Sequence, residues 1–315
     1  MPCSDDTIDY MSMNANDDLI MEPLFINDEN TCRIINSDAI SGMRTISDGS
    51  VNTIVTSPPY WGFRAYTGGD DIRELGVEPV LNDYVSNMVA VFRECRRILS
   101  DDGVLWLNIG DGYTSGGRKT RIGDHIASKD SARGQVYNRP DTPAGLKKKD
   151  MLGVPWRVAF ALQADGWYLR ADIIWLKPNA MPTGHIYDRV QQDYEHVFML
   201  TKSEHYVYNI EAGYEPSADG KGTRQGRSIW SIPTEARKTG HPAVMPLALA
   251  EKCVMLSSNE NDTVFDPFTG SGTTAIAALN NSRNFIGTEL SNDYVNIAKN
   301  RILNEACTHA EIIII

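Results

Sequence analysis

The sequence predicts an α/β fold in which a mostly parallel β-sheet is covered by helices on both faces. From Arg33 onward, short apolar runs alternate with amphipathic stretches of helical period. Strands that alternate with helices of this length are typical of parallel sheets with helical crossovers. The 315 residues contain neither an internal repeat nor a convincing linker, so we expect a single domain over residues 24–315.

Local signals place the individual elements. The strand 51–55 must stop before Pro58 and Pro59, because two consecutive prolines cannot continue a β-ladder. The other expected elements are a helix over 83–99 capped by Asn82 or Asp83, a turn at 101–103, strands over 104–109, 168–176, 196–200, 263–265 and 284–288, and helices over 155–164, 246–256, 273–279 and 292–304, the last capped by Ser291.

Composition indicates a cytoplasmic protein without a structural metal. No run of 18 apolar residues could span a membrane, and the start of the chain lacks the features of a secretory signal. The five cysteines are scattered without a C-x-x-C pair and the six histidines do not cluster, which argues against disulfides and a zinc site. Residues 1–23 are polar, acidic and aperiodic, and we expect this leader to be disordered.

The net charge of −11 is distributed unevenly. Residues 1–30 hold eight acidic and no basic residues, so the rest of the chain carries only −3. Residues 112–149 hold nine basic and three acidic residues, and contact with nucleic-acid phosphates requires such a local basic segment. A solvated basic loop explains the charge equally well. The regions 112–150 and 203–228 lack a clear period, and long irregular segments in a compact domain are usually functional or disordered.

A glycine-rich turn begins at Asp266, after an apolar strand and before a helix. Its sequence is Asp-Pro-Phe-Thr-Gly-Ser-Gly-Thr-Thr, and Gly270 and Gly272 permit positive φ and close approach of a ligand. Glu289 ends the next strand 19 residues after Gly270, where α/β proteins hold the ribose of a nucleotide. This order of elements favours a nucleotide-like cofactor over a purely structural turn.

A second turn, Thr-Ser-Pro-Pro-Tyr-Trp over residues 56–61, closes the strand 51–55. An exocyclic base amine is a poor nucleophile because its lone pair is delocalised into the ring. The hydroxyl of Ser57 and the carbonyl of Pro58 are suited to accept hydrogen bonds from the amine, and Tyr60 offers a face on which an extruded base stacks. A rigid turn with a packed aromatic side chain explains the isolated motif equally well.

Together the two turns resemble the amino-methylating DNA methyltransferases, which form N4-methylcytosine or N6-methyladenine. The family's catalytic motif is Asp/Asn/Ser-Pro-Pro-Tyr/Phe, and its cofactor motif has the form Asp-Pro-Phe-x-Gly-Ser-Gly-Thr. The catalytic motif comes first here, which resembles the circularly permuted beta order. Further similar segments extend the resemblance over residues 31–304, at Ile35–Asp38, Asn138–Lys147, Asp172–Asn179, Glu195–Lys202 and His241–Pro246.

The resemblance implies a Rossmann-like methyltransferase fold with a seven-stranded sheet, and S-adenosylmethionine as cofactor. The residues implied to hold the flipped base are Ser57, Pro58, Pro59 and Tyr60. The implied cofactor residues are Asp38 near the adenine, Glu289 at the ribose, and Asp266, Phe268, Gly270, Gly272 and Thr273 on the methionine side. The expected DNA contacts are two inserts, residues 112–150 and 203–228, and the basic residues Arg118, Lys119, Arg121, Arg139, Lys147, Lys148 and Lys149.

Ser57 decides the expected base. Asp or Asn is usual at this position in the adenine enzymes, so the serine favours site-specific methylation of the N4 amine of cytosine in double-stranded DNA. Methylation of N6 of adenine is the alternative. A restriction endonuclease is the partner that such an enzyme would have in a restriction–modification system.

Other functions fit the sequence less well. A carbon-5 cytosine methyltransferase needs a nucleophilic cysteine, usually after proline, and the only such pair is Pro2-Cys3 in the acidic leader. Methyltransferases of RNA or protein glutamine use a similar turn but place the cofactor motif first. A phosphate-binding NTPase requires a Walker lysine that the glycine turn lacks. A catalytically inactive DNA-binding relative is the alternative that cofactor binding would test.

Overall fold

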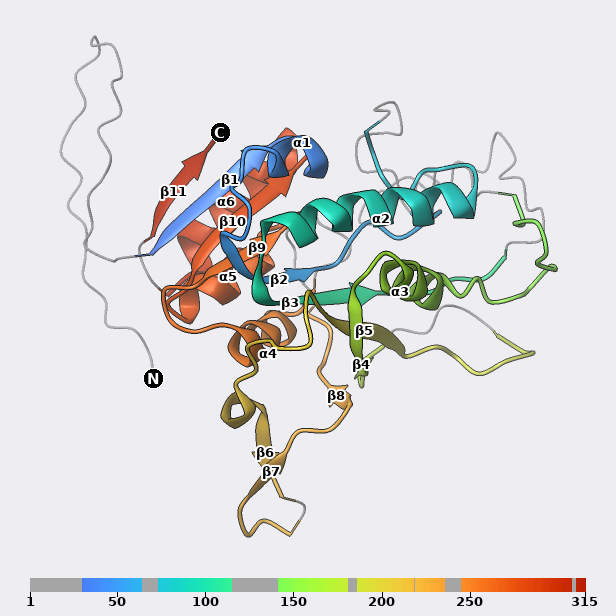
Figure 1. The fold of residues 1–315 in the computed structure, drawn as a ribbon. Coiled ribbons are helices and arrows are strands. Elements are labelled where there is room, and N and C mark those ends of the chain that lie inside the picture. The colour runs from blue at the N-terminus through green and yellow to red at the C-terminus, as the bar shows by residue number, and fades with distance from the viewer. Residues whose placement is uncertain are drawn as a thin grey trace, which may run out of the picture.

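The computed structural model describes residues 30–63, 73–114, 141–180, 186–217, 219–235, 245–307 and 310–315. One open sheet runs through these residues, with helices on both faces (Figure 1). The predicted acidic leader, residues 1–23, lies outside the described residues. Within the described ranges, every helix is too short or too polar to span a lipid bilayer.

In this part of the chain the sheet has nine strands, in the order β11-β1-β10-β9-β2-β3-β5-β4-β8. Neighbouring strands pair in parallel except at β5, which runs antiparallel to both β3 and β4. The strands are β1 (Thr31–Asn36), β2 (Val51–Thr56), β3 (Leu99–Ile109), β4 (Tyr168–Leu176), β5 (Tyr194–Thr201), β8 (Ile229–Ser231), β9 (Thr263–Asp266), β10 (Asn284–Glu289) and β11 (Glu311–Ile314).

The mostly parallel sheet is therefore confirmed, but the expected number of seven strands is wrong. The two additional strands, β8 and β11, are the edge strands of the sheet. They have three and four residues, which is too short to show an alternation of apolar and polar positions in the sequence. Of the remaining seven strands, six lie where the sequence predicts a strand, namely β2, β3, β4, β5, β9 and β10, whereas β1 was not predicted as a strand.

Six helices cover the sheet in the described residues. Ser291 occupies the N-cap position of α6 as predicted, although its side chain makes no capping hydrogen bond. The helices are α1 (Ala39–Met43), α2 (Leu81–Ile98), α3 (Val154–Ala164), α4 (Leu247–Ser257), α5 (Thr273–Asn280) and α6 (Asn292–Glu305), and a short 3₁₀ helix, η1 (Ile210–Gly213), precedes the small hairpin of β6 (Tyr214–Pro216) and β7 (Thr223–Gln225).

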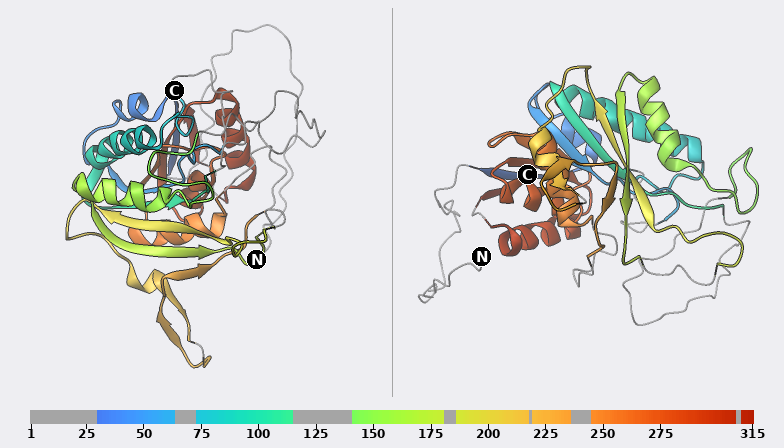
Figure 2. Two further views of the ribbon diagram at one scale, coloured as in Figure 1. Left: turned by 90° about the vertical axis from the view of Figure 1, so that its right-hand side faces the viewer. Right: turned by 90° about the horizontal axis from the view of Figure 1, so that it is seen from below.

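The sheet has an apolar core on each face. In β2, Ile54 belongs to the cluster that includes α1, α2 and α3, whereas Val55 belongs to the cluster that includes α4, α5 and α6. Leu105 and Trp106 of β3 divide in the same way, because successive side chains of a strand point to opposite faces. The helices accordingly lie in two layers on either side of the sheet (Figure 2).

The start of α2 differs from the prediction. The helix begins at Leu81 after the N-cap residue Val80, so Asn82 and Asp83 lie in its first turn and do not cap it. The Leu81 side chain is buried in the core. The packing of the Leu81 side chain starts the helix before Asn82 and Asp83, the polar residues that would otherwise mark its start.

The segment Asp101–Gly103, predicted as a turn, lies inside β3. Val51 pairs with Leu99 and Thr53 pairs with Val104, so two steps along β2 correspond to five along β3. The additional residues form an irregularity in the ladder instead of ending the strand. The apolar run that follows enters the core as expected.

The carboxyl ends of the parallel strands form one border of the sheet, here called its carboxyl edge. This is where α/β proteins bind their ligands. The carboxyl ends of β1, β2, β9 and β10 meet there, since these strands are parallel neighbours. The antiparallel strand β5 begins at the same edge, with Tyr194 opposite Leu176 at the end of β4.

The predicted insert 203–228 leaves the sheet at the opposite edge. The N–H of Val207 donates to the carbonyl of Asp102 at 2.9 Å, and the side chain of Asn209 donates to the carbonyl of Ser258 at 2.8 Å. From there the β6–β7 hairpin projects away from the sheet (Figure 1), and β8 then returns beside β4. Contact of this insert with DNA stays a prediction.

Candidate active site

A cavity of about 550 Å³ lies at the carboxyl edge of the sheet, between the ends of β2 and β9. Ser57 and Pro58 line it from the turn after β2, and Phe268 and Gly270 line it from the turn after β9. The two turns that the sequence singles out are more than 200 residues apart, yet they share this cavity. They meet because β2 and β9 are adjacent parallel strands.

Asp266 connects the two turns directly. The Thr56 hydroxyl, at the end of β2, donates to one oxygen of the carboxyl group at 2.6 Å. The N–H of Phe268 donates to the same oxygen and the hydroxyl of Thr274 donates to the other, each at 2.9 Å. Burial raises the pKa of Asp266 to about 6, although these hydrogen bonds oppose the shift. The group therefore fixes the position of the serine turn relative to the glycine turn.

Glu289, at the end of β10, holds the glycine turn in place. The N–H of Gly270 donates to one carboxylate oxygen at 2.8 Å and the N–H of Ser291 donates to the other at 2.9 Å. Gly270 has a φ of +53°, in the left-handed region that favours glycine. Burial raises the pKa of the Glu289 carboxyl group. The side chain also lines the cavity, as its predicted contact with ribose requires.

Three further predicted cofactor residues line the same cavity. Asp38, just after β1, accepts a hydrogen bond from the N–H of Ser41 at 2.9 Å and so caps α1. Phe268 and Thr273 contribute from the glycine turn and the start of α5. The structure brings these residues together, and their contacts with the cofactor stay predictions.

Gly272 is the one predicted cofactor residue that is not among those lining the cavity. It has a φ of +80° and forms the N-cap of α5. A Cβ atom added there would lie 3.2 Å from the Cβ of Ala298 in α6. Close packing between the turn and α6 therefore explains this glycine without a ligand.

The serine turn is held by a side chain of α2 and by a backbone carbonyl of the loop that precedes α2. The Tyr84 hydroxyl donates to the carbonyl of Pro59 at 2.9 Å, and the indole N–H of Trp61 donates to the carbonyl of Glu78 at 2.8 Å. Within the described residues, no donor is bonded to the carbonyl of Pro58. The predicted acceptor for the amine therefore remains available, whereas the Pro59 carbonyl serves to fix the turn.

Three polar residues that sequence reasoning missed surround Tyr60. Its hydroxyl lies 2.7 Å from Oε2 of Glu195, at the start of β5, and 3.3 Å from the Oγ of Ser57. Glu195 forms an ion pair with Lys177, which follows β4, and accepts a hydrogen bond from the amide of Asn108 in β3 at 3.1 Å. These residues come from strands far apart in the sequence. Lys177 and Glu195 lie in segments that resemble core strands of the family, whereas Asn108 had no signal beyond its place in an apolar strand.

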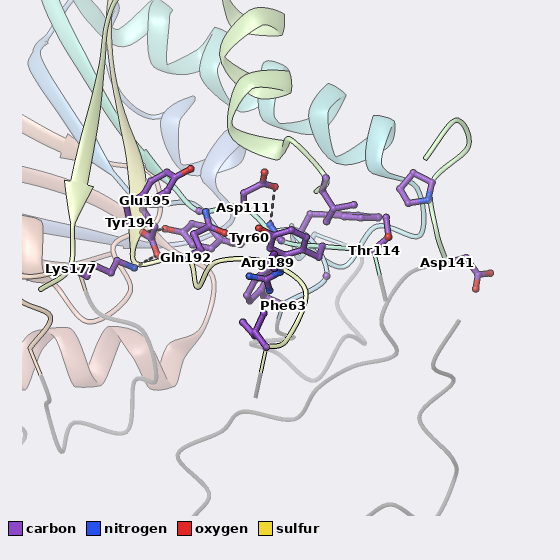
Figure 3. A pocket seen from close by; sticks show the side chains of 18 residues that line it. Tyr60, Phe63, Asp111, Thr114, Asp141, Lys177, Arg189, Gln192, Tyr194 and Glu195 are labelled. Atoms are coloured by element: carbon purple, nitrogen blue, oxygen red, sulfur yellow. Dashed lines mark hydrogen bonds and ion pairs between the residues drawn. The ribbon is translucent and has the colours of Figure 1, made fainter. Parts of the chain in front are cut away.

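A second cavity of about 450 Å³ adjoins the first (Figure 3). The two cavities share Tyr60, Phe63, Lys177 and Glu195. On the far side of the second cavity, the guanidinium of Arg189 lies 3.8 Å from the ring centroid of Tyr113. The two cavities thus form one continuous hollow, and its part beyond the serine turn is lined partly by aromatic side chains.

Only part of the predicted DNA-contact set lies in the described residues. Lys147, Lys148 and Lys149 are exposed. Lys147 pairs with Asp150 at 3.3 Å, and Lys149 pairs with Asp188. The predicted contacts that fall outside the described residues are Arg118, Lys119, Arg121 and Arg139.

Comparison with known families decides the assignment. The sequence matches the DNA methylase family over residues 51–300, a range that contains both turns. The chain belongs to the N6/N4 DNA methylase family. The methylase is 46% identical over 284 residues to the Type II methyltransferase M.Cfr9I of Citrobacter freundii. The alignment covers 90% of this chain and 91% of that protein. It is 47% identical over 274 residues to the Type II methyltransferase M.SmaI of Serratia marcescens, which covers 87% of this chain and 91% of that protein.

Solved structures agree with this assignment. TTHA0409, a putative DNA modification methylase from Thermus thermophilus in complex with S-adenosyl-L-methionine, superimposes on the methylase with a TM-score of 0.64 and 26% identity, over 90% of this chain and 98% of that chain. The cytosine-N4-specific PvuII DNA methyltransferase superimposes with a TM-score of 0.63, over 88% of this chain and 94% of that chain. At 18% identity, the second match shows the shared fold alone.

Proposed function

We propose that this methylase is a Type II modification enzyme that transfers a methyl group from S-adenosylmethionine to the exocyclic N4 amine of cytosine in DNA. The observation that carries the proposal is the cavity that Ser57 and the glycine turn share. The hydrogen bond from Thr56 to Asp266 joins the two turns beside it. The Type II methyltransferases to which the chain is 46% and 47% identical support the reaction class.

The cavity fits the cofactor in size and chemistry. Its volume of about 550 Å³ lies within the range of roughly 300–1,000 Å³ typical of cofactor pockets. Glu289 and Asp38 contribute carboxylates that would accept hydrogen bonds from hydroxyl and amino groups of the cofactor, and Phe268 and Tyr294 contribute apolar surface. These residues would hold S-adenosylmethionine, which supplies an electrophilic methyl group when bound.

The residues of the serine turn act on the target amine. The Ser57 hydroxyl and the Pro58 carbonyl accept hydrogen bonds from the two amine hydrogens, so that the nitrogen lone pair turns out of the ring plane toward the donor. The amine would gain its methyl group as the cofactor loses it, and the proton that the methylated amine releases would pass to water. Tyr60 offers a ring face for the base once it has left the duplex, which places the reaction away from the stacked bases.

Ser57 is also the observation that favours cytosine over adenine. Asp or Asn is usual here in the adenine enzymes, so N6 of adenine remains the second candidate. The partners would be double-stranded DNA and, in a cytoplasmic restriction–modification system, a cognate endonuclease. Exposed Lys147, Lys148 and Lys149 would contact phosphates beside the cavity.

The proposal is tested by identifying the modified nucleoside. The full-length protein is incubated with methyl-labelled S-adenosylmethionine and bacterial genomic DNA, the DNA is digested, and the nucleosides are separated against standards. We expect label in N4-methylcytosine, and sequencing of the modified DNA gives the recognised site. Label in N6-methyladenine would correct the base alone, whereas 5-methylcytosine or label on protein alone would reject the reaction.

A further inference from the structure

Glu195 lies at the end of a chain of hydrogen bonds that reaches the proposed acceptor of the amine. The Tyr60 hydroxyl lies 2.7 Å from Oε2 of Glu195 and 3.3 Å from the Oγ of Ser57. The amide oxygen of Asn108 is 3.5 Å from the same hydroxyl, at the limit of a hydrogen bond. The single proton of Tyr60 is therefore donated to Glu195.

This arrangement sets the direction of the remaining bond. An ionised carboxylate only accepts hydrogen bonds, and a tyrosine hydroxyl has one proton to donate. Because Tyr60 donates to Glu195, its oxygen must accept in the contact with Ser57. The Ser57 proton is then directed at Tyr60, and the Oγ atom presents lone pairs to the cavity.

The Glu195 carboxylate is itself fixed by two donors. Oε1 is paired with the ammonium of Lys177, which also lies 4.4 Å from the ring centroid of Trp175. Oε2 accepts from the amide of Asn108 at 3.1 Å, and the second N–H of that amide donates to the carbonyl of His196 at 3.2 Å. The Lys177 and Glu195 side chains lie side by side at the cavity (Figure 3). They are only 17% and 16% exposed. The carboxylate is thus held in one orientation toward Tyr60.

We infer that Glu195 is a positioning residue which, through Tyr60, makes Ser57 an obligatory hydrogen-bond acceptor and so selects an amino base over its keto counterpart. The inference rests on the proposed function of Ser57. A cytosine amine donates to the serine oxygen, whereas O4 of uracil at the same place would face lone pairs. Such a mismatch rejects a ligand by leaving buried polar groups without a complementary partner.

Glu195→Gln separates this role from a structural one. Lys177 attracts the amide oxygen of the glutamine, which turns its NH₂ group toward Tyr60, and the Asn108 amide then loses this acceptor but keeps its bond to the carbonyl of His196. Tyr60 then accepts from the amide and donates to Ser57, and Ser57 donates its own proton into the cavity. The variant reverses the direction of the chain, so it should tolerate a keto base better than the wild type does.

The experiment measures binding and turnover on matched duplexes. The duplexes carry the site identified by sequencing of the modified DNA, with either the target base or its deaminated counterpart: uracil for cytosine, or hypoxanthine for adenine. Binding is measured with S-adenosylhomocysteine present. For Glu195→Gln we expect the preference for the amino base to fall about 10-fold and kcat to fall about 10- to 100-fold, as the loss of a hydrogen bond to a charged group implies. Affinity for S-adenosylhomocysteine should not change.

Tyr60→Phe breaks the same chain and keeps the ring face. It should lower the preference by a similar factor, and the double variant should discriminate no worse than Tyr60→Phe alone, because both changes remove one interaction. Glu94→Gln is the matched control, since Glu94 forms a half-buried ion pair with Arg97 at 2.9 Å near the end of α2.

An unchanged preference between the two duplexes in Glu195→Gln, or in Tyr60→Phe where the first variant does not fold, overturns the inference. Failure of the proposed function is a different result, because it appears as the absence of a methylated amine in the wild type. The choice between cytosine and adenine does not affect the comparison, since both bases carry an amine.

Discussion

At the scale of single residues, Asp266 is the group whose protonation links the serine turn to stability. Burial raises its pKa to about 6, from an ordinary value of about 4. The folded protein therefore keeps a proton that the unfolded chain releases between about pH 4 and pH 6. Stability from this group is full below the lower value and is lost as pH rises through the upper one.

Asp266→Asn should remove this pH dependence. From pH 5 to pH 8, the wild type should lose about 1 kcal/mol of unfolding free energy through Asp266, and the variant should not. Urea unfolding at both pH values measures the difference. Asp293→Asn, at an exposed position in the first turn of α6, is the control and should behave as the wild type does. Equal pH dependence in all three proteins would contradict the assigned protonation.

Ser57 lies one residue beyond the Thr56 that bonds to Asp266, and its proposed role is confined to the amine. Ser57→Ala should therefore lower the single-turnover rate by about 100-fold, a loss typical of one hydrogen-bond donor or acceptor at a reacting centre. The affinity for S-adenosylhomocysteine, measured by calorimetry, should stay within about twofold. Parallel losses in rate and affinity would place the serine in cofactor binding instead.

At the scale of elements, the glycine turn between β9 and α5 shows two glycines with different tasks. Gly270 donates its N–H to Glu289 at the cavity, whereas Gly272 turns the chain into α5 against Ala298. Gly272→Ala combines a φ of +80° with a Cβ contact of 3.2 Å, so it should cost about 2 kcal/mol or more of stability. Urea unfolding measures this cost.

Gly49→Ala is the matched control for the glycine turn. Gly49 has a φ of +64°, and a Cβ atom added there would meet nothing within 4 Å. The substitution should therefore cost only the backbone strain, about 1 kcal/mol. If the two variants lose the same stability, contact with α6 does not explain Gly272.

The central elements and both turns could be predicted from the sequence because their signals are local. Apolar runs define β2, β3 and β9, and the prolines and glycines that end them mark the turns. The short strands β8 and β11 have no such signal, since they depend on pairing with a sheet that already exists. The same limit applies to Glu195 and Lys177. Glu195 contacts Tyr60 and Asn108, and Lys177 contacts Glu195, only because β4 ends and β5 begins at the edge of the sheet that carries the cavity.

At the scale of the whole molecule, the chain has a negative net charge, and its proposed substrate, DNA, is negatively charged too. The acidic leader carries most of the net charge of −11, and the basic residues concentrate in 112–149. In the described residues, the exposed side chains of Lys147 and Lys149 are each paired with an aspartate. Exposed pairs of this kind contribute little to stability, so DNA phosphates can replace the aspartates at small cost.

The three lysines should therefore contribute to the salt dependence of DNA binding. Replacing Lys147, Lys148 and Lys149 with Ala should weaken binding to any duplex and reduce the slope of log K against log salt by about 2 to 3, because each phosphate contact contributes about 0.9. Fluorescence anisotropy at several salt concentrations measures the slope. Lys221→Ala combined with Arg224→Ala makes the matched change in the β6–β7 hairpin, which projects from the opposite edge of the sheet. A lower slope in that variant would place the hairpin on the DNA as well, and an unchanged slope in the lysine variant would remove residues 147–149 from the interface.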